Sequence, residues 1–128
     1  MVDGFAECFS FRTMTIFHLV AQEDWARAEI LGVYCAPSLA SEGFIHFSTG
    51  QQLLRSAERF YSGRDDMIAI MVREDRLTAP LRFEFAHGES FPHLYGALNL
   101  DAVLEVLLLP RDVDGRFRIP EKWVGLEF

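Results

Sequence analysis

The chain has 128 residues, of which 50% are hydrophobic and 24% charged, and 19 Asp+Glu against 12 Lys+Arg give a formal net charge of -7. This is the size and composition of one globular domain with a sizeable core, and no apolar run approaches the roughly 20 residues that a membrane span needs. Nucleic acids and anionic membranes are bound through clustered Lys and Arg, whereas this chain has one lysine and scattered arginines. We therefore expect neither a nucleic acid nor a membrane as a partner. The net charge does not exclude a small-molecule ligand.

The two cysteines, Cys8 and Cys35, form no CxxC pair, and the N-terminus lacks the basic start and long apolar core of a signal peptide. These features predict a cytoplasmic protein with reduced thiols. Residues 1–13 show no periodicity, so we expect an ill-ordered N-terminal extension before a single α+β domain over 14–128. A chain that begins at Met14 should melt at nearly the same temperature as the full chain, which thermal denaturation would test.

Hydrophobic patterning predicts five or six strands. Three interior strands, apolar on both faces, are expected over 15–20, 44–48 and 67–72. Residues 81–85 alternate apolar and charged, which predicts a strand with one apolar face. A further strand over 103–109 should be followed by a hairpin that turns at Asp114-Gly115.

Two main helices are expected, both early in the chain. The first should begin at Gln22 and end at Gly32, the usual residue at a helix C-terminus. Thr49, followed by Gln52 three residues later, matches a capping box for the second helix, which should end near Gly63. The apolar side chains predicted to face the core are Trp25, Ala28 and Leu31 in the first helix, and Leu53, Ala57, Phe60 and Tyr61 in the second.

Polar side chains interrupt two of the most apolar strands. His18 lies in the middle of the first strand, and His46 and Ser48 share one face of the second because side chains alternate along a strand. A buried imidazole needs hydrogen-bond partners for both ring nitrogens. One such residue alone is more often a satisfied core histidine. For His18, His46 and Ser48 together, the pattern supports two interpretations equally: one shared polar cleft, or a separate buried hydrogen-bond partner for each residue.

Two further features could contribute to such a cleft. Residues 91–96 predict a loop of large side chains, in which His93 and Tyr95 either close the cleft or help to plug the end of the core. Glu84 would ordinarily form an exposed ion pair with Arg82. If its face of the strand meets the cleft instead, Glu84 becomes the acid–base or hydroxyl-orienting group.

The known cofactor and metal motifs are absent from the sequence. His18, His46, His93 and Glu84 could in principle hold a metal ion, but there is no HxH, HExxH or cysteine pair that would place ligands together. We therefore expect no metal. GxGxxG, GxxxxGK and GxSxG are also missing, so no Rossmann, P-loop or hydrolase-elbow signature applies.

The motifs, in their order along the chain, resemble the bacterial family catalogued as domain of unknown function 952. They are a strand with His18 before a Trp-containing helix, then GFIHFST with Gln51-Gln52, then FPHLYG before a Leu-rich strand, from about Thr15 to about Pro120. Such domains are distantly similar to the ADP-ribosyltransferase-like fold, which includes RNA 2′-phosphotransferases. The resemblance implies a split mixed β-sheet of five to six strands with two main helices, whose cleft holds NAD without a Rossmann loop.

The same resemblance implies roles for particular residues. His18 would hold a ribose hydroxyl or phosphate oxygen, and His46 and Ser48 would line the nicotinamide ribose. Tyr95 or an aromatic neighbour would stack on the nicotinamide ring. Glu84 would stabilise an oxocarbenium-like ribose, although in those enzymes the glutamate comes on a later strand. This assigns catalysis to Glu84 and His46, and substrate binding to His18, Ser48, His93 and Tyr95.

The expected function is thus NAD or nucleotide binding, with ADP-ribosyl or glycosyl transfer in a His-lined cleft and NAD as the substrate. Two alternatives stay open: a non-catalytic module that senses a nucleotide-like ligand, and a metal-dependent enzyme. Assaying free nicotinamide after incubation with NAD separates the first two, and metal analysis of the purified protein tests the third.

Overall fold

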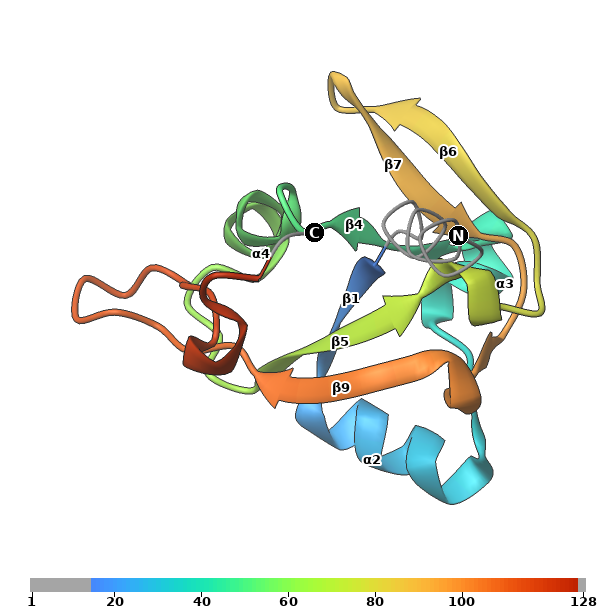
Figure 1. Cartoon of the computed structure of the whole chain (residues 1–128), viewed down its shortest axis with the longest axis horizontal. Coiled ribbons are helices and arrows are strands. Elements are labelled where there is room, and N and C mark those ends of the chain that lie inside the picture. The colour runs from blue at the N-terminus through green and yellow to red at the C-terminus, as the bar shows by residue number, and fades with distance from the viewer. Residues whose placement is uncertain (1–14, 127–128) are drawn as a thin grey trace, which may run out of the picture.

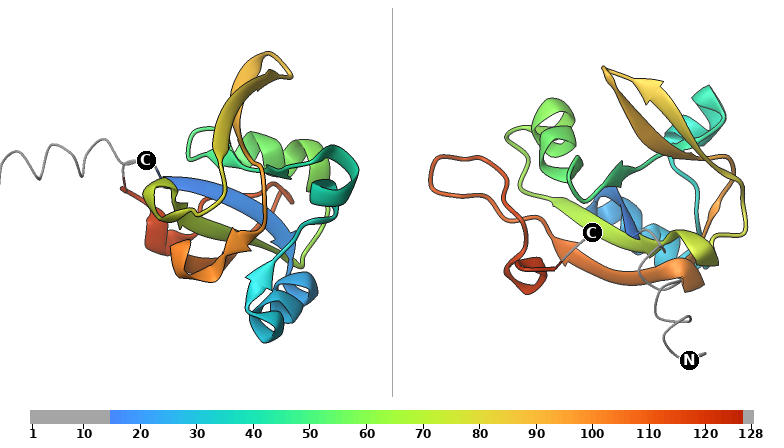
Figure 2. Two further views of the ribbon diagram at one scale, coloured as in Figure 1. Left: turned by 90° about the vertical axis from the view of Figure 1, so that its right-hand side faces the viewer. Right: turned by 45° about the horizontal axis from the view of Figure 1, so that its top comes forward.

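The computed structural model describes residues 15–126, which form three helices and three separate antiparallel sheets (Figures 1 and 2). The predicted extension over 1–13 lies outside these residues. The helices are α2 (Gln22–Leu31), α3 (Pro37–Glu42) and α4 (Leu53–Tyr61). The strands are β1 (Thr15–Ala21), β2 (Val33–Tyr34), β3 (Ile45–His46), β4 (Ser48–Thr49), β5 (Met67–Arg73), β6 (Leu81–Ala86), β7 (Glu89–Leu94), β8 (Leu98–Asn99) and β9 (Val103–Leu108).

A four-stranded sheet in the order β4-β1-β5-β9 forms the centre of the molecule. Its inner strands β1 and β5 are buried on both faces, as their apolar residues at successive positions predicted. All strand pairings of the described residues are antiparallel, so the expected mixed sheet is wrong. A tight turn joins β6 to β7, whereas the connections from β1 to β5 and from β5 to β9 are long and contain the helices and the strands of the smaller sheets.

Both faces of this sheet are covered, and the two sides have separate cores. Ile16, His18 and Val20 of β1 lie on the first side, against α2, the β2–β8 pair and the base of the three-stranded sheet. Phe17 and Leu19 lie on the second side, against α4 and the C-terminal segment. Period-two alternation along β1 therefore decides which core each residue enters.

The residues at which the helices end agree with the prediction better than the residues predicted to be buried in them. Gly32 ends α2 with a φ of 82°, and its N–H donates to Ala28 O at 2.8 Å. Trp25 and Ala28 are buried as expected. Leu31 and Phe60, which the apolar stripes placed in the core, are instead exposed, because only part of the surface of each short helix contacts the sheet.

The predicted strand over 44–48 is divided between two sheets. Residues up to His46 pair with β7 in the sheet β3-β7-β6, whereas Ser48–Thr49 pair with β1 in the central sheet. Phe47, which is 2% exposed, lies at the break. Side chains before and after this point consequently do not follow one alternation.

Residues 91–96, expected as a loop, mostly belong to a strand. β7 pairs with β6 through a hairpin whose two turn residues, His87 and Gly88, both have positive φ, at 52° and 85°. Pro92 lies within β7 although proline cannot donate a hydrogen bond to a ladder. It is tolerated because Pro92 and Phe83 form a non-hydrogen-bonded pair, so the nitrogen and the carbonyl of Pro92 both point away from β6. The missing N–H therefore costs no bond to β6, and the carbonyl accepts from Phe47 N at 2.9 Å.

The β6–β7 hairpin projects from the body of the molecule in each view (Figures 1 and 2). For this reason the apolar face expected of residues 81–85 is not buried: Phe83 is 44% and Phe85 77% exposed. Near the C-terminus, the predicted turn at Asp114-Gly115 forms. Among the described residues it is flanked by one isolated β-bridge, between Arg111 and Phe117, and not by the second strand of a hairpin. No helix within residues 15–126 is long and apolar enough to cross a membrane.

Candidate functional site

The polar face of the sheet β3-β7-β6 gathers four of the residues singled out in the sequence. His46 of β3 lies opposite His93 of β7, which lies opposite Arg82 of β6. Glu84 is two residues beyond Arg82 and Tyr95 two residues beyond His93, so all five side chains project from one face. Glu84 thus shares its face with His46 and His93, on this sheet and without His18.

His93 is the buried member of this group, at 5% exposed. Phe44 stacks on its ring, with centroids 4.0 Å apart and planes 18° from parallel. Its Nδ1 lies 2.8 Å from Glu84 Oε1, so Nδ1 carries a proton and donates to the carboxylate. Among the described residues, Nε2 has no hydrogen-bond partner, and this nitrogen remains for another group.

The Glu84 carboxylate is held at one oxygen and open at the other. Its Oε1 accepts hydrogen bonds from Tyr95 OH at 2.6 Å and from His93 Nδ1, and both bonds lower the pKa of Glu84. The carboxylate in turn raises the pKa of the Tyr95 phenol. Arg82 lies with its guanidinium 5.2 Å from the centre of the Tyr95 ring. Glu84 is therefore an oriented anion at neutral pH, suited to accept a ligand hydroxyl and unsuited to donate a proton.

His46 lies at the exposed end of the same group. Its Nε2 is 3.1 Å from Glu42 Oε2 of α3, and its ring is 5.3 Å from that of His93 in an edge-on arrangement. The side chain keeps 53% exposure. It is thus accessible to a ligand and carries a neighbouring carboxylate that can orient its ring. We define the set His46, Glu84, His93 and Tyr95, with Phe44 and Arg82, as the hairpin cluster.

His18 does not belong to the hairpin cluster. It is 7% exposed in the first core, with Nδ1 2.6 Å from the backbone oxygen of His46 and Nε2 2.7 Å from Tyr34 OH. Because a carbonyl only accepts, Nδ1 donates and Nε2 accepts from the phenol. Burial lowers the pKa of His18 to about 4, which keeps the ring neutral. Both nitrogens are satisfied within the protein, so His18 is a core histidine that holds β3 against β1.

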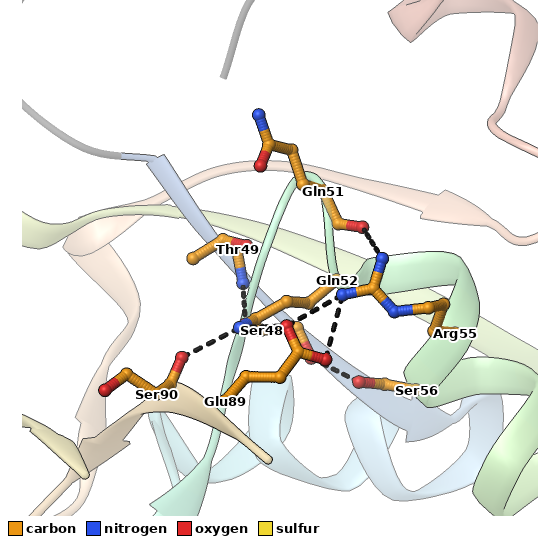
Figure 3. A network of polar contacts seen from close by, with 8 residues as sticks. All are labelled: Ser48, Thr49, Gln51, Gln52, Arg55, Ser56, Glu89 and Ser90. Carbon is orange, nitrogen blue, oxygen red and sulfur yellow. Dashed lines mark hydrogen bonds and ion pairs between the residues drawn. The ribbon is translucent and has the colours of Figure 1, made fainter. Parts of the chain in front are cut away.

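Ser48 lies on the other side of the central sheet from His18. It is paired with Phe17 and its hydroxyl contacts that of Ser56 in α4 at 2.9 Å (Figure 3). The expected cleft shared by His18, His46 and Ser48 is therefore wrong. The parity argument fails because the chain changes sheets at Phe47, between His46 and Ser48.

Gln52, beside Ser48, ties the projecting hairpin to the body. Its Oε1 accepts from Thr49 N at 3.0 Å, which is half of the predicted capping box, and its Nε2 donates to Ser90 O at 2.8 Å (Figure 3). Nε2 also contacts Glu89, whose carboxylate is held by both an Arg55 nitrogen and this amide. The hairpin thus has a polar anchor as well as its apolar base.

Replacing Gln52 by Ala should destabilise the protein by about 1–3 kcal/mol, because Thr49 N and Ser90 O then lose their partner in a largely buried place. The matched control is Gln51→Ala, since the Gln51 side chain is exposed and only its backbone oxygen is used, by Arg55. That control should stay within about 0.5 kcal/mol of the parent. Urea denaturation measures both, and equal effects of the two changes would contradict the assigned anchor.

Sequence reasoning missed several partners of the cluster. The Phe44 ring and the Glu42 carboxylate contact the His46 ring, and Tyr34 OH contacts His18, yet none of the three is an unusual residue in its own segment. One signal was present for the hairpin itself: His87-Gly88 between alternating segments is a two-residue turn. Pairing the strands across this turn would have placed Arg82 opposite His93.

Two surface hollows lie outside the hairpin cluster, one beside Arg111 and one beside Trp123. Within residues 15–126 no group of three or more His, Cys, Asp or Glu side chains is arranged to hold a metal ion.

Fold and site together define a small α+β protein with several antiparallel sheets and a His- and Glu-bearing hairpin. Residues 19–106 match the family described as "Protein of unknown function (DUF952)", and the chain belongs to this family. It is also similar to the X-ray crystal structure of protein CC0527 from Caulobacter crescentus, with 27% identity, a TM-score of 0.75, and 81% of this chain and 93% of that chain covered. The solution NMR structure of CC0527 gives 27% identity and a TM-score of 0.74 over 88% and 98%. No functionally curated protein matches the chain.

Proposed function

We propose that the chain binds a nucleotide-like small molecule at the hairpin cluster, with NAD as the ligand to test. The observation that carries the proposal is the Glu84 carboxylate, fixed through Oε1 by Tyr95 and His93 while Oε2 has no partner among the described residues. A ribose presents neighbouring hydroxyls that donate to such an oxygen. The ADP-ribosyltransferase-like resemblance supports NAD as the first candidate among nucleotides.

The surroundings of Glu84 suit the other parts of a nucleotide. Phe44 and His93 form a stacked pair, and Tyr95 lies with its ring 5.3 Å from that of Phe44, so a flat base or nicotinamide has aromatic faces to contact. Arg82 supplies a cation beside Tyr95 for a phosphate oxygen. His18 and Ser48 have no part in this binding mode.

The same geometry supports a division of roles if the N-glycosidic bond of NAD is broken. The ionised and oriented carboxylate of Glu84 would accept a hydrogen bond from the ribose 2′-hydroxyl and stabilise positive charge on the sugar. His46 is the accessible group that can take a proton from an acceptor, with Glu42 orienting its ring. Nicotinamide leaves with the electron pair of the broken bond, and the acceptor oxygen or water forms the new bond to the ribose.

Thermal-shift measurements with NAD, ADP-ribose and other nucleotides test the binding. A ligand at one hundred times its dissociation constant adds about 2.7 kcal/mol of apparent stability. Release of free nicotinamide on incubation with NAD supports the transferase chemistry. Binding without release supports the non-catalytic module, and the absence of any nucleotide-dependent shift contradicts the proposal.

Glu84→Gln should weaken ligand affinity about tenfold or more, because a neutral amide replaces the carboxylate that accepts the hydroxyl. The matched control is Glu89→Gln on the neighbouring strand, whose carboxylate contacts Arg55 and Gln52 outside the cluster. Titration calorimetry should show binding by this control close to that of the parent. Equal losses in the two variants would remove Glu84 from the binding site.

A further inference from the structure

The β6 strand is an open sheet edge on the projecting hairpin. Among residues 15–126 it pairs with β7 alone, in the order β3-β7-β6, and Figure 1 shows β6 on the outer side of the hairpin, with no labelled element of this part of the chain beside its free edge. Sheet edges of this kind offer unpaired N–H and C=O groups to another strand, and proteins normally cover or charge them. β6 carries neither a proline nor a lysine between Leu81 and Ala86.

The hydrogen-bond register shows which backbone groups face this edge. Tyr95 N donates to Pro80 O at 2.8 Å, which makes these two residues a hydrogen-bonded pair of the ladder. Antiparallel pairs alternate, so Arg82 and Glu84 also bond to β7 while the residues between them do not. Phe83 accordingly lies opposite Pro92, which has no N–H to offer and whose carbonyl is taken by Phe47. The outward backbone groups are those of Leu81, Phe83 and Phe85.

We propose that β6 pairs with β6 of a second copy of this chain, antiparallel and centred on Phe83, to form a two-fold symmetric dimer. Such an edge pairing joins two three-stranded sheets into one and makes about six new backbone hydrogen bonds. In this register Phe83 lies on the two-fold axis, opposite Phe83 of the second copy. The outward N–H and C=O groups of Leu81, Phe83 and Phe85 then face the outward groups of Phe85, Phe83 and Leu81 of the second copy, so all three pairs are hydrogen-bonded.

The side chains of β6 are complementary to themselves in this register. Arg82 of one copy lies opposite Glu84 of the other, and the same pair recurs across the axis, so both contacts join opposite charges. On the other face, Phe83 meets Phe83 and Leu81 meets Phe85 of the second copy, which covers the two exposed phenylalanines. A shift by two residues would instead place like charges opposite each other.

The pairing also affects the hairpin cluster, because Arg82 of the second copy would lie beside the open Oε2 of Glu84. The dimer itself does not depend on the ligand proposed above. The experiment measures mass and not nucleotide binding, so the two proposals can fail separately.

The test is sedimentation of the full chain over a range of concentrations, with two charge variants. Arg82→Glu places Glu opposite Glu84, and Glu84→Arg places Arg opposite Arg82, so each alone should raise the dimer dissociation constant about tenfold or more. An equimolar mixture of the two restores both opposite-charge pairs and should recover the dimer. Arg76→Glu, an equal charge change at an exposed site in the turn η1 (Glu74–Arg76), is the matched control and should dimerise like the parent.

Amide hydrogen exchange on the parent keeps the proposal falsifiable if a charge variant does not fold. The amides of Phe83 and Phe85 should exchange rapidly at low concentration and slow down as the dimer forms, whereas those of Arg82 and Glu84 are protected at both. A parent that stays monomeric overturns the proposal. Three other results also overturn it. They are an unchanged dimer in Arg82→Glu, no recovery of the dimer on mixing the two variants, and a Phe83 amide that stays unprotected in the parent dimer.

Discussion

Replacing Trp25 by Ala should lower the free energy of unfolding by about 3–5 kcal/mol, because it empties the space of a large side chain in the first core. Trp25 is 5% exposed, and its ring lies 5.8 Å from that of Tyr34, the partner of His18. Chemical denaturation followed by circular dichroism measures the change. Ile30→Ala is the control on the same helix, since Ile30 is 85% exposed, and it should stay within about 0.5 kcal/mol of the parent.

The indole nitrogen adds a second, smaller expectation. Nε1 of Trp25 is buried and has no hydrogen-bond partner among the described residues. Trp25→Phe keeps most of the apolar contact and removes this unsatisfied donor, so its effect should be well below that of Trp25→Ala. A Trp25→Ala variant as stable as the parent would contradict a core role and return the ring to consideration as a ligand contact.

The parts of the fold that could be predicted from sequence are those decided by local patterns. The buried strands β1 and β5 are apolar on both faces apart from His18, and Gly32 marks the end of α2. Alternation in 81–85 correctly indicates that Phe83 and Phe85 share a face, but it does not say what covers that face. Coverage depends on where the hairpin points, and the hairpin projects away from both cores.

The site shows the same division. His93, Tyr95 and Glu84 were each singled out as polar or aromatic groups of unusual placement, and the register of β6 against β7 brings them together. His18 and Ser48 were assigned to the same place by alternation along one unbroken strand. The change of sheet at Phe47 follows from packing between distant segments, which no local pattern contains.

Replacing His18 should reduce stability, contrary to what a ligand-binding histidine would do. Gln cannot reach both the backbone oxygen of His46 and the hydroxyl of Tyr34, so His18→Gln leaves at least one buried group unpaired, at about 1–3 kcal/mol. Tyr34→Phe removes the phenol that donates to Nε2. If the two residues act as one unit, the double variant should be destabilised by less than the sum of the single changes, by about 0.5–3 kcal/mol.

The pH dependence of unfolding gives an independent test of the same histidine. The pKa of His18 is lowered to about 4 in the folded protein, whereas its ordinary value is near 6.5. Between pH 6.5 and pH 4 the imidazole is therefore protonated in the unfolded chain and neutral in the folded protein. The stabilisation is therefore complete above about pH 6.5 and is lost as the pH falls toward 4, by about 3 kcal/mol in all. His18→Gln should flatten the stability curve in this window. An equally steep curve for the variant between pH 6.5 and 4 would show that another group titrates there and that His18 is not the neutral core residue described.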